Sequence, residues 1–455
     1  MSISHPAADK SGLYFYLITK LSVMKNKVVL ITGTNSGFGW LTATSCAALG
    51  HKVYATMRDT KGRNAEKAKA LTRQANIEVL DVELTSGKSV NDAIATIIKK
   101  EARLDVVVNN AGIYAVGIAE TFTEEDLAKV MDVNVQGPWR IIRAALPQMR
   151  KQGEGLIINI SSVAGRFAFP FQTPYDVSKF AVEGLTEGLH YEVRPMGVDV
   201  VMVQPGAFPT DIWGKILNGS DATVISGYGD LARVPAQIGA GIGQMFEALK
   251  PNPQLIADAI VNLMDTPIGK RPLRTVVDPA TGGFSEKANQ QVKEQYENLL
   301  TAFGMGSMLK ASDFTTTFLV DQTPTEVFNA IKNVRGWWSG EIKGETDKPG
   351  AEFTYEVPGA HYSKQKITEF IPGKKVVWLV LDATLSFVEN KSEWKNTEII
   401  FEITKKGART EVRFTHKGLV PAFQCYDGVS NAWGLLVNGN LRKLIITGQV
   451  QPSPW

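Results

Sequence analysis

The chain has 455 residues, of which 44% are hydrophobic and 21% charged, and its net charge is +3. This length exceeds what one hydrophobic core usually supports, so we expect two or three domains. The nearly balanced charge gives no sign of a nucleic acid partner, and two distant cysteines, Cys46 and Cys425, exclude a disulfide framework and fit the reducing cytoplasm.

The first 23 residues contain an apolar run, "GLYFYLITKLSV", that is interrupted by Lys20. The run is too short to span a bilayer and no small-residue cleavage site follows it, so we expect neither a membrane anchor nor a signal peptide. Met24 opens "MKNKVVLITG", which is a natural beginning for the fold that follows. We therefore expect residues 1–23 to be a dispensable extension.

Residues 24–302 alternate between short apolar runs and helical stretches. β-branched apolar runs are typical of buried parallel strands, which we expect at 27–33, 51–59, 77–82 and 104–112. Helices are expected between them, over 40–50, 61–75 and 87–101. This β-α-β-α-β order predicts an α/β fold with a doubly wound parallel Rossmann sheet.

The turn after the first expected strand reads "TGTNSGFG", with glycines at positions 33, 37 and 39. Small residues let the backbone approach a pyrophosphate, and the start of the next helix offers free N–H groups to the anion. The alternative is a tight turn without a ligand. The position of the turn between an apolar strand and a helix favours dinucleotide binding.

A tyrosine four residues before a lysine occurs three times, at Tyr16–Lys20, Tyr175–Lys179 and Tyr362–Lys366. Residues four apart share one face of a helix, so the spacing alone identifies no proton-transfer pair. Tyr362 and Lys366 fall in an expected strand, where residues four apart stand well separated. Only Tyr175 follows both the glycine turn and the strand that ends in "NNAG".

Five motifs occur in order: "TGTNSGFG", "NNAG" (109–112), "NISS" (159–162), "YDVSK" (175–179) and "PGAFPT" (205–210). Together they resemble the ordered motif set of the short-chain dehydrogenase/reductase family, over roughly residues 25–300. The resemblance implies an enzyme that interconverts a carbonyl and an alcohol with NAD or NADP. It also implies that Tyr175–Lys179 is the catalytic copy of the spacing.

The catalytic residues implied by the resemblance are Asn134, Ser162, Tyr175 and Lys179. A phenol has a pKa of about 10, which the Lys179 ammonium would lower. Tyr175 would then pass a proton to the carbonyl oxygen, and Ser162, favoured over Ser161 by its offset, would hydrogen-bond the same oxygen. Lys179 would also hold the nicotinamide ribose. The Asn134 backbone would hold a relay water; the alternative is a locally satisfied polar residue in a helix.

The same resemblance implies a set of residues around the dinucleotide. They are Gly33, Asn35, Ser36, Gly37, Phe38, Gly39, Arg58, Asp81, Val82, Asn109, Ala111, Gly112, Tyr175, Lys179, Pro205, Gly206, Phe208 and Thr210. Asn109 would line the adenosine, and Asp81 and Val82 would contact adenine. The Phe208 backbone would meet the carboxamide, with the Thr210 hydroxyl near the cofactor. A strand-end cap is the alternative for Asp81. No metal site is expected.

The end of the second expected strand bears on the choice of cofactor. Thr56 stands where an acidic residue would select NAD, and Arg58 follows two residues later. A guanidinium can pair with a 2′-phosphate, so NADP is favoured over NAD. Asp59 argues against NADP, because its carboxylate could neutralise Arg58.

The segment 211–250 lies where the family keeps a mobile substrate loop. It mixes Trp213, Ile216 and Tyr228 with many glycines and alanines. We expect a flexible, largely apolar lid over an uncharged small molecule, whose identity the sequence does not give.

Residues 303–312, "FGMGSMLKAS", are expected to form a flexible linker. Beyond it, residues 313–455 change pattern. Thr323, Pro324 and Glu326 have the order of a capped helix start, for a helix over 323–338. Strands are expected at 313–322, 351–357, 363–371, 374–381, 397–406 and 408–419, before a long amphipathic helix over 426–448.

This second pattern resembles the START-like (SRPBCC) superfamily, in the branch of the activators of the heat-shock-protein ATPase, over about 312–450. The resemblance is carried by "TPTEVFNAIKNVRGWWSG", "FIPGKKVVW", "TEVRFTHKGLVP" and "NAWG". It implies an α+β helix-grip fold, in which a sheet wraps the long helix and can leave a cavity for a hydrophobic ligand. Trp337 and Trp338 are expected in the core and at its rim, with a ligand cage as the alternative. His416 and Cys425 match no metal-ligand spacing.

These expectations combine into one hypothesis: a cytoplasmic NADP-dependent oxidoreductase acting on an uncharged, apolar small molecule, with an appended ligand-binding domain. No nucleic acid or membrane partner is expected, and a homo-oligomer is left open. The alternative is a non-catalytic binding protein, either a dinucleotide sensor or a chaperone cofactor. The complete catalytic set argues against that alternative.

Overall fold

The computed structural model describes residues 26–309, 313–420 and 423–450. The described residues divide into two compact units, one within Asn26–Lys310 and one within Ala311–Trp455. The expected extension 1–23 and the Tyr16–Lys20 pair lie outside the described residues. No helix in the described ranges is both long enough and apolar enough to cross a membrane.

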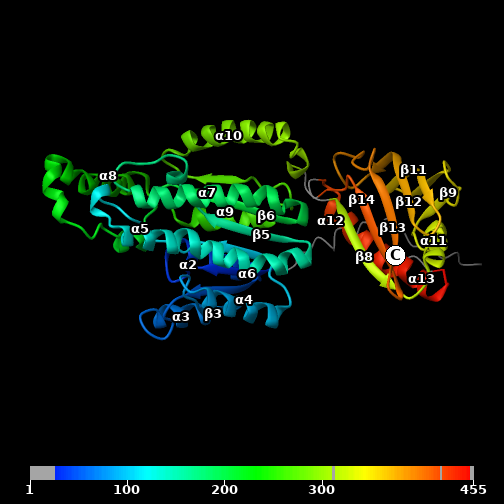
Figure 1. The fold of residues 1–455 in the computed structure, drawn as a ribbon, viewed down its shortest axis with the longest axis horizontal. Coiled ribbons are helices and arrows are strands. Elements are labelled where there is room, and N and C mark those ends of the chain that lie inside the picture. The colour runs from blue at the N-terminus through cyan, green and yellow to red at the C-terminus, as the bar shows by residue number, and fades with distance from the viewer. Residues whose placement is uncertain (1–25, 310–312, 421–422, 451–455) are drawn as a thin grey trace, which may run out of the picture. The chain divides into compact units, whose positions relative to one another are not determined.

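A seven-stranded sheet in the order β3-β2-β1-β4-β5-β6-β7 forms the centre of the described first unit (Figure 1). All of its neighbouring strands are parallel. The strands are β1 (Val28–Thr32), β2 (Lys52–Met57), β3 (Ile77–Asp81), β4 (Val106–Asn109), β5 (Gly155–Ile160), β6 (Val198–Pro205) and β7 (Arg274–Val277). The predicted parallel Rossmann sheet is thus confirmed.

Helices cover both faces of this sheet, and β1 shows why. Its residues Val29 and Ile31 pack with α2 and α9 on one face, whereas Val28 and Leu30 pack with α4, α6 and α7 on the other. The helices are α2 (Gly37–Ala48), α3 (Ala65–Thr72), α4 (Gly87–Glu101), α5 (Glu124–Met131), α6 (Gly137–Gln152), α7 (Thr173–Val193), α8 (Val234–Leu249), α9 (Gln254–Asp265) and α10 (Gly282–Ala302).

The strand order reverses between β1 and β4, which places the loops after these strands at one edge of the sheet. Short 3₁₀ segments occur in the connections: η1 (Ala119–Thr121), η3 (Val163–Gly165), η4 (Arg194–Met196), η5 (Asp211–Lys215), η6 (Thr223–Arg233) and η7 (Gly306–Leu309). A π-helical segment, η2 (Asp132–Gln136), joins α5 to α6. Part of the expected linker 303–312 is therefore helical, in η7.

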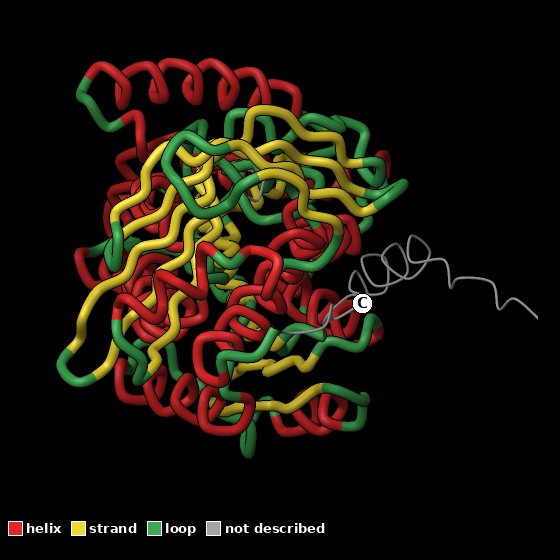
Figure 2. Tube along the Cα trace, turned by 90° about the vertical axis from the view of Figure 1, so that its right-hand side faces the viewer, coloured by secondary structure: helices red, strands yellow, loops and turns green. Residues whose placement is uncertain are grey.

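The second unit contains an antiparallel sheet in the order β8-β14-β13-β12-β11-β10-β9. Figure 2 shows these strands side by side in yellow. They are β8 (Phe314–Val320), β9 (Glu341–Gly344), β10 (Glu352–Val357), β11 (His361–Ile371), β12 (Lys375–Leu385), β13 (Glu398–Lys406) and β14 (Arg409–Lys417). Tyr362 and Lys366 lie on β11, as expected.

The helical parts of the second unit pack on the inner face of its sheet. They are α11 (Pro324–Lys332), η8 (Val334–Gly336), α12 (Tyr426–Trp433), the π segment η9 (Gly434–Leu441) and α13 (Arg442–Thr447). Thr323 and Glu326 form the expected capping box of α11. The expected long C-terminal helix is present, although η9 widens its middle.

Aromatic side chains fill the core of the second unit. Trp338 stacks on Tyr355 and Trp378 with centroid separations of 4.6 and 5.8 Å. Trp433 of the C-terminal helix lies 5.1 Å from Trp338. These rings are buried, so the second unit has a hydrophobic core of its own.

Candidate active site

The glycine turn lies against the segment that follows β4. Gly33 and Gly37 have φ values of +71° and +55°, which favour glycine. A methyl group on Gly39 would come within 2.4 Å of the Gly33 carbonyl oxygen and the Asn110 amide nitrogen. A methyl group on Gly33 would come within 2.8 Å of Ala111 Cα. There is therefore no room for a side chain at Gly33 or Gly39, and no side chain covers the backbone of the turn at these positions.

Helix α2 begins directly after this turn without a local capping group. The Ser36 side chain makes no capping hydrogen bond, and no acidic residue lies in the first turn of the helix. First-turn N–H groups have no partner inside a helix and attract anions. The bare turn and the uncapped helix start together fit the pyrophosphate of a dinucleotide.

Asn35 connects the glycine turn to the loop after β2. Its amide donates to the Asn64 side chain at 3.3 Å, and the Asn64 amide donates to the Arg58 carbonyl at 2.6 Å. The pair fixes the Arg58 backbone beside the turn. The Arg58 backbone thus lies beside the glycine turn, and its contact with a dinucleotide stays a prediction.

The charged neighbours of Arg58 differ from the expected ones. Its guanidinium lies 3.8 Å from the Glu83 carboxylate, and both side chains are about half exposed. Asp59 instead accepts a hydrogen bond from the Arg63 amide at 3.0 Å, with the Arg63 Nε at 3.9 Å. The acid that competes for Arg58 is therefore Glu83 rather than Asp59.

The Asp81 carboxylate caps the loop after β2. It accepts hydrogen bonds from the Asp59 amide at 3.1 Å and from the Thr60 amide and hydroxyl at 2.8 Å each. These bonds lower the pKa of Asp81 against the opposing effect of desolvation. The neighbouring Val82 is buried, and its amide donates to the Met57 carbonyl. The structure thus supports the capping alternative for Asp81.

The "NNAG" segment is held by side-chain hydrogen bonds. The Asn109 amide donates to Asn159 on β5 at 2.8 Å, which ties two central strands together, while the buried Asn109 Oδ1 has no partner. Asn110 donates to the Thr32 carbonyl at 2.8 Å and to the Gly33 carbonyl at 3.1 Å. Asn110 therefore fixes the glycine turn, a role that the sequence analysis did not assign.

Ser162, Tyr175 and Lys179 meet between the end of β5 and the first turns of α7. Ser162 is a neighbour of the Tyr175 phenol and lowers its pKa, against the larger effect of burial. The Lys179 ammonium donates to the Ile160 carbonyl at 2.8 Å and lies 5.4 Å from the centre of the Tyr175 ring. Ser162 also lies 3.4 Å from the Pro205 carbonyl, at the end of β6.

Burial acts on both members of this pair. It raises the pKa of Tyr175, and the neighbouring Ser162 opposes this effect. Burial also lowers the pKa of Lys179 to about 8. The Lys179 ammonium donates to the Ile160 carbonyl over the face of the Tyr175 ring, and the lowering of the Tyr175 pKa by Lys179 stays a prediction.

Asn134 lies in the π segment η2, where the widened helix often marks a functional position. Its side chain accepts from the Ile113 amide at 2.8 Å and donates to the Ile113 carbonyl at 2.9 Å and to Ser178 at 3.0 Å. A methyl group on Gly112 would lie 3.3 Å from Asn134 Oδ1. The Asn134 side chain is therefore structural, which leaves its backbone for the expected role.

The "PGAFPT" loop closes over the glycine turn. The rings of Phe208 and Phe38 meet edge to face at 5.7 Å. A methyl group on Gly37 would lie 3.3 Å from Thr210 Cβ. The Gly206 amide donates to the end of β7 at 2.9 Å, which fixes where the loop begins. The residues expected around the dinucleotide thus come from loops that the fold brings together.

An aromatic row extends from Tyr175. Tyr114 meets Tyr175 edge to face at 4.7 Å and Trp213 at 5.2 Å, and Trp213 meets Phe246 of α8 at 5.6 Å. The Tyr114 hydroxyl donates to Gln172 at 2.7 Å, which orients its ring. Tyr114 was not predicted from the sequence, although its position two residues after "NNAG" is a signal that could have found it.

The expected lid is folded in the structure. It contains η5, η6 and α8, and its base is tied to the segment after β4. The Leu217 amide donates to the Tyr114 carbonyl at 2.8 Å, and Ser220 makes two hydrogen bonds to Asp126. The lid therefore holds the aromatic row in place, while α8 has no buried residue.

No cluster of three or more histidine, cysteine or acidic side chains suited to a metal ion occurs among the described residues. The model of the short chain dehydrogenase family matches residues 27–221. The chain is 41% identical over 187 residues to a 3-ketodihydrosphingosine reductase of Bacteroides thetaiotaomicron, a match that covers 41% of this chain and 66% of that protein.

Two further comparisons extend the match. The chain is 36% identical over 255 residues to human 17-beta-hydroxysteroid dehydrogenase type 1, covering 54% of this chain and 76% of that protein. A short-chain dehydrogenase from Streptomyces avermitilis has a similar solved structure, with 32% identity and a TM-score of 0.50. That likeness covers 63% of this chain and 98% of the solved one.

The glycine turn gives the first testable prediction. In Gly39→Ala, the methyl group would collide with the Gly33 carbonyl. We therefore expect the affinity for a nicotinamide dinucleotide to fall at least about tenfold, which corresponds to about 1.4 kcal/mol of binding free energy. Gly87→Ala is the control, because Gly87 also starts a helix but has nothing within 4 Å of the added carbon. Fluorescence titration with NADPH measures both; equal affinities would contradict the role of the turn.

Proposed function

Because the chain belongs to the short-chain dehydrogenase/reductase family, we propose that its first unit reduces the ketone of an uncharged, largely apolar molecule with NADPH, and runs the reverse oxidation with NADP. One observation carries the proposal: the buried Tyr175 phenol has Ser162 as a neighbour and the Lys179 ammonium 5.4 Å from the centre of its ring.

In this proposal, the bound nicotinamide supplies the hydride. The Tyr175 hydroxyl gives its proton to the carbonyl oxygen as that oxygen gains charge. Ser162 donates a hydrogen bond to the same oxygen. Lys179, held by the Ile160 carbonyl, stabilises the tyrosinate that remains after proton transfer.

The substrate class follows from the aromatic row and from the relatives. Tyr114 and Trp213 present ring faces and edges beside Tyr175, and they suit a flat or long apolar body. By their names, the two similar enzymes act on a ketosphingosine and on a hydroxysteroid. A lipophilic ketone of this general kind is the substrate that we propose.

The choice of NADP rests on Arg58. Its backbone is fixed through Asn64 and Asn35 beside the glycine turn, and its side chain is held only by an exposed contact with Glu83. Exposed ion pairs are weak, so a 2′-phosphate can displace Glu83 from the guanidinium.

For the second unit, we propose a START-like helix-grip domain that binds a small uncharged molecule on the inner face of its sheet. Among the described residues, Gln365 Oε1, His361 Nε2 and the Trp378 indole nitrogen are buried there without a partner. Burial lowers the pKa of His361 to about 3, so its ring is neutral. These atoms favour a ligand that is mainly aromatic but has one or two polar groups, a revision of the purely hydrophobic ligand.

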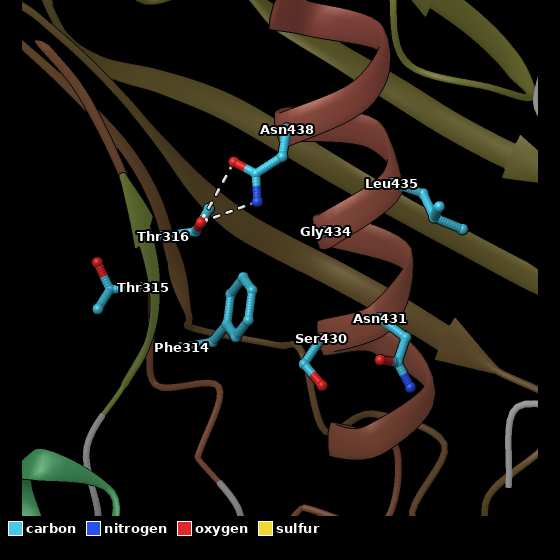
Figure 3. A pocket seen from close by; sticks show the side chains of 8 residues that line it. All are labelled: Phe314, Thr315, Thr316, Ser430, Asn431, Gly434, Leu435 and Asn438. Carbon is cyan, nitrogen blue, oxygen red and sulfur yellow. Dashed lines mark hydrogen bonds between the residues drawn. The ribbon is translucent and has the colours of Figure 1, made fainter. Parts of the chain in front are cut away.

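A shallow groove of about 410 Å³ lies on the same unit, between β8 and the C-terminal helix (Figure 3). Its lining contains Phe314 and Leu435, with a hydrogen-bonded pair, Thr316 and Asn438. The groove is open to solvent, and we do not assign it to the proposed ligand.

The Tyr175→Phe variant tests the chemistry. Loss of the proton donor should slow ketone reduction by about 10²- to 10⁴-fold, while NADPH binding stays close to that of the unaltered chain. Tyr362→Phe is the control, since it has the same Tyr–Lys spacing on strand β11. Initial rates of NADPH oxidation measure both; comparable rates in the two variants would refute the assignment.

The Arg58→Ala variant tests the cofactor. A charge-assisted contact is worth about 1.5–3 kcal/mol, so the affinity for NADPH should fall by about tenfold or more while that for NADH changes little. Glu83→Gln should strengthen NADPH binding, because it removes the competing acid. Arg63→Ala, in the same loop, is the control. An equal loss for both dinucleotides in Arg58→Ala would show that Arg58 does not read the phosphate.

Thermal unfolding of two fragments tests whether the two units fold and bind their ligands independently. Residues 310–455 and 24–302 should each unfold cooperatively, since each has its own core. Indole should raise the midpoint of the first fragment only, and NADPH that of the second only. A non-cooperative 310–455 fragment would refute an independent domain; a cooperative fragment that indole does not affect would refute the inner-face ligand site.

A further inference from the structure

A buried carboxylate outside the expected catalytic set lies one helical turn beyond Lys179. Glu183, on α7, is 5% exposed. It accepts hydrogen bonds from the Ser161 hydroxyl at 2.6 Å, from Gln204 on β6 at 2.9 Å, and from Arg274 on β7 at 2.7 Å. Glu183 thus joins the turn that carries Ser162 to three elements of the fold.

The turn also packs tightly on this side chain. A methyl group on Gly165 would lie 2.7 Å from the Ser161 hydroxyl and 2.9 Å from Glu183 Cγ. The turn after β5 therefore rests directly on the carboxylate. Because Ser161 precedes Ser162, the Glu183–Ser161 hydrogen bond sets the direction in which Ser162 presents its hydroxyl.

The counter-charge of Glu183 is shared. Arg274 also donates to Glu187 at 3.1 Å, so one guanidinium serves two carboxylates. The Glu183 and Arg274 side chains are 7% and 5% exposed, while that of Glu187 is 21% exposed. Since Arg274 is divided between them, part of the Glu183 charge remains to act on Lys179 through a buried region, where such effects are strong.

We propose that Glu183 is a positioning residue for carbonyl reduction: it fixes the serine turn after β5 and stabilises the Lys179 ammonium. This inference rests on the proposed function of the first unit. It assigns no contact between Glu183 and substrate or cofactor; the carboxylate acts through Ser161 and through the field at Lys179.

The electrostatic part agrees with the surroundings of Lys179. Burial lowers the pKa of Lys179, and Glu183 is the charged group that opposes this effect. The other titratable groups around the pair are Tyr175, Asp176 and Glu187 on α7, Tyr114 after β4, Arg166 after η3, and Arg274 on β7. Arg166 and Arg274 are cations, so they cannot replace Glu183 in stabilising an ammonium.

The test is the pH profile of Glu183→Gln in the full chain. Lys179 acts as an ammonium, and removal of the carboxylate lowers its pKa, so activity should be lost at lower pH on the alkaline side. We expect that limb to move down by about one pH unit. Glu187→Gln is the matched control: it also loses a bond to Arg274 but keeps Glu183 and its contact with Ser161, so its limb should move far less than that of Glu183→Gln.

A second variant separates this role from a loss of folding. The single variant Glu183→Gln leaves Arg274 with one carboxylate partner. The double variant, which adds Arg274→Gln, removes both buried charges, so it should melt at a higher temperature than the single variant. Its alkaline limb should still be displaced. A limb that stays at the position of the unaltered chain in a folded variant overturns the inference.

The pH dependence of NADPH binding, followed by fluorescence, gives a readout that needs no turnover. If the unaltered chain binds NADPH but reduces no ketone, the proposed function fails, while the shift between Glu183→Gln and Glu187→Gln still decides the inference. If the unaltered chain is active and the binding profiles of the two variants coincide, the inference fails alone.

Discussion

In the proposed active site, the Lys179 ammonium has to stay charged in a buried position beside the buried Tyr175 phenol. Lys179 is 7% exposed, and its hydrogen bond goes to the Ile160 carbonyl at the end of β5. A carbonyl satisfies one donor but carries no charge, so burial lowers the pKa of Lys179 to about 8. Residues on the surrounding elements, from β5 to β7, provide the charge and the hydrogen bonds that the Lys179–Tyr175 pair does not provide itself.

Helix α7 meets this constraint by carrying several groups on successive turns. Tyr175 and Lys179 face the end of β5, and Glu183 follows on the next turn among Ser161, Gln204 and Arg274. The same helix begins beside Gln172, which orients Tyr114 at the other side of Tyr175. One helix thus relates the proton donor, its electrostatic support and the aromatic row. The second unit, with its separate core, shares none of these groups.

The elements that could be predicted from the sequence are those that a short local pattern specifies. The alternating strands and helices, the glycine turn and the capping box at Thr323 follow from short-range rules, and all occur in the structure. Long-range choices were beyond reach: the partner of Arg58 is Glu83 because of how two loops meet, and Asp81 turned out to cap a loop. Helix α10 was missed because few of its residues are buried, so its sequence lacks a clear apolar stripe.

Deuterium transfer is the most direct test of the proposed ketone reduction. NADPH in which deuterium replaces both hydrogens at the reactive carbon of the nicotinamide ring is incubated with the full chain and a set of lipophilic ketones, including steroid and long-chain ketones. We expect an alcohol that carries one deuterium at the former carbonyl carbon. A chain that binds NADPH yet forms no deuterated alcohol from any of these ketones would refute the proposed reduction.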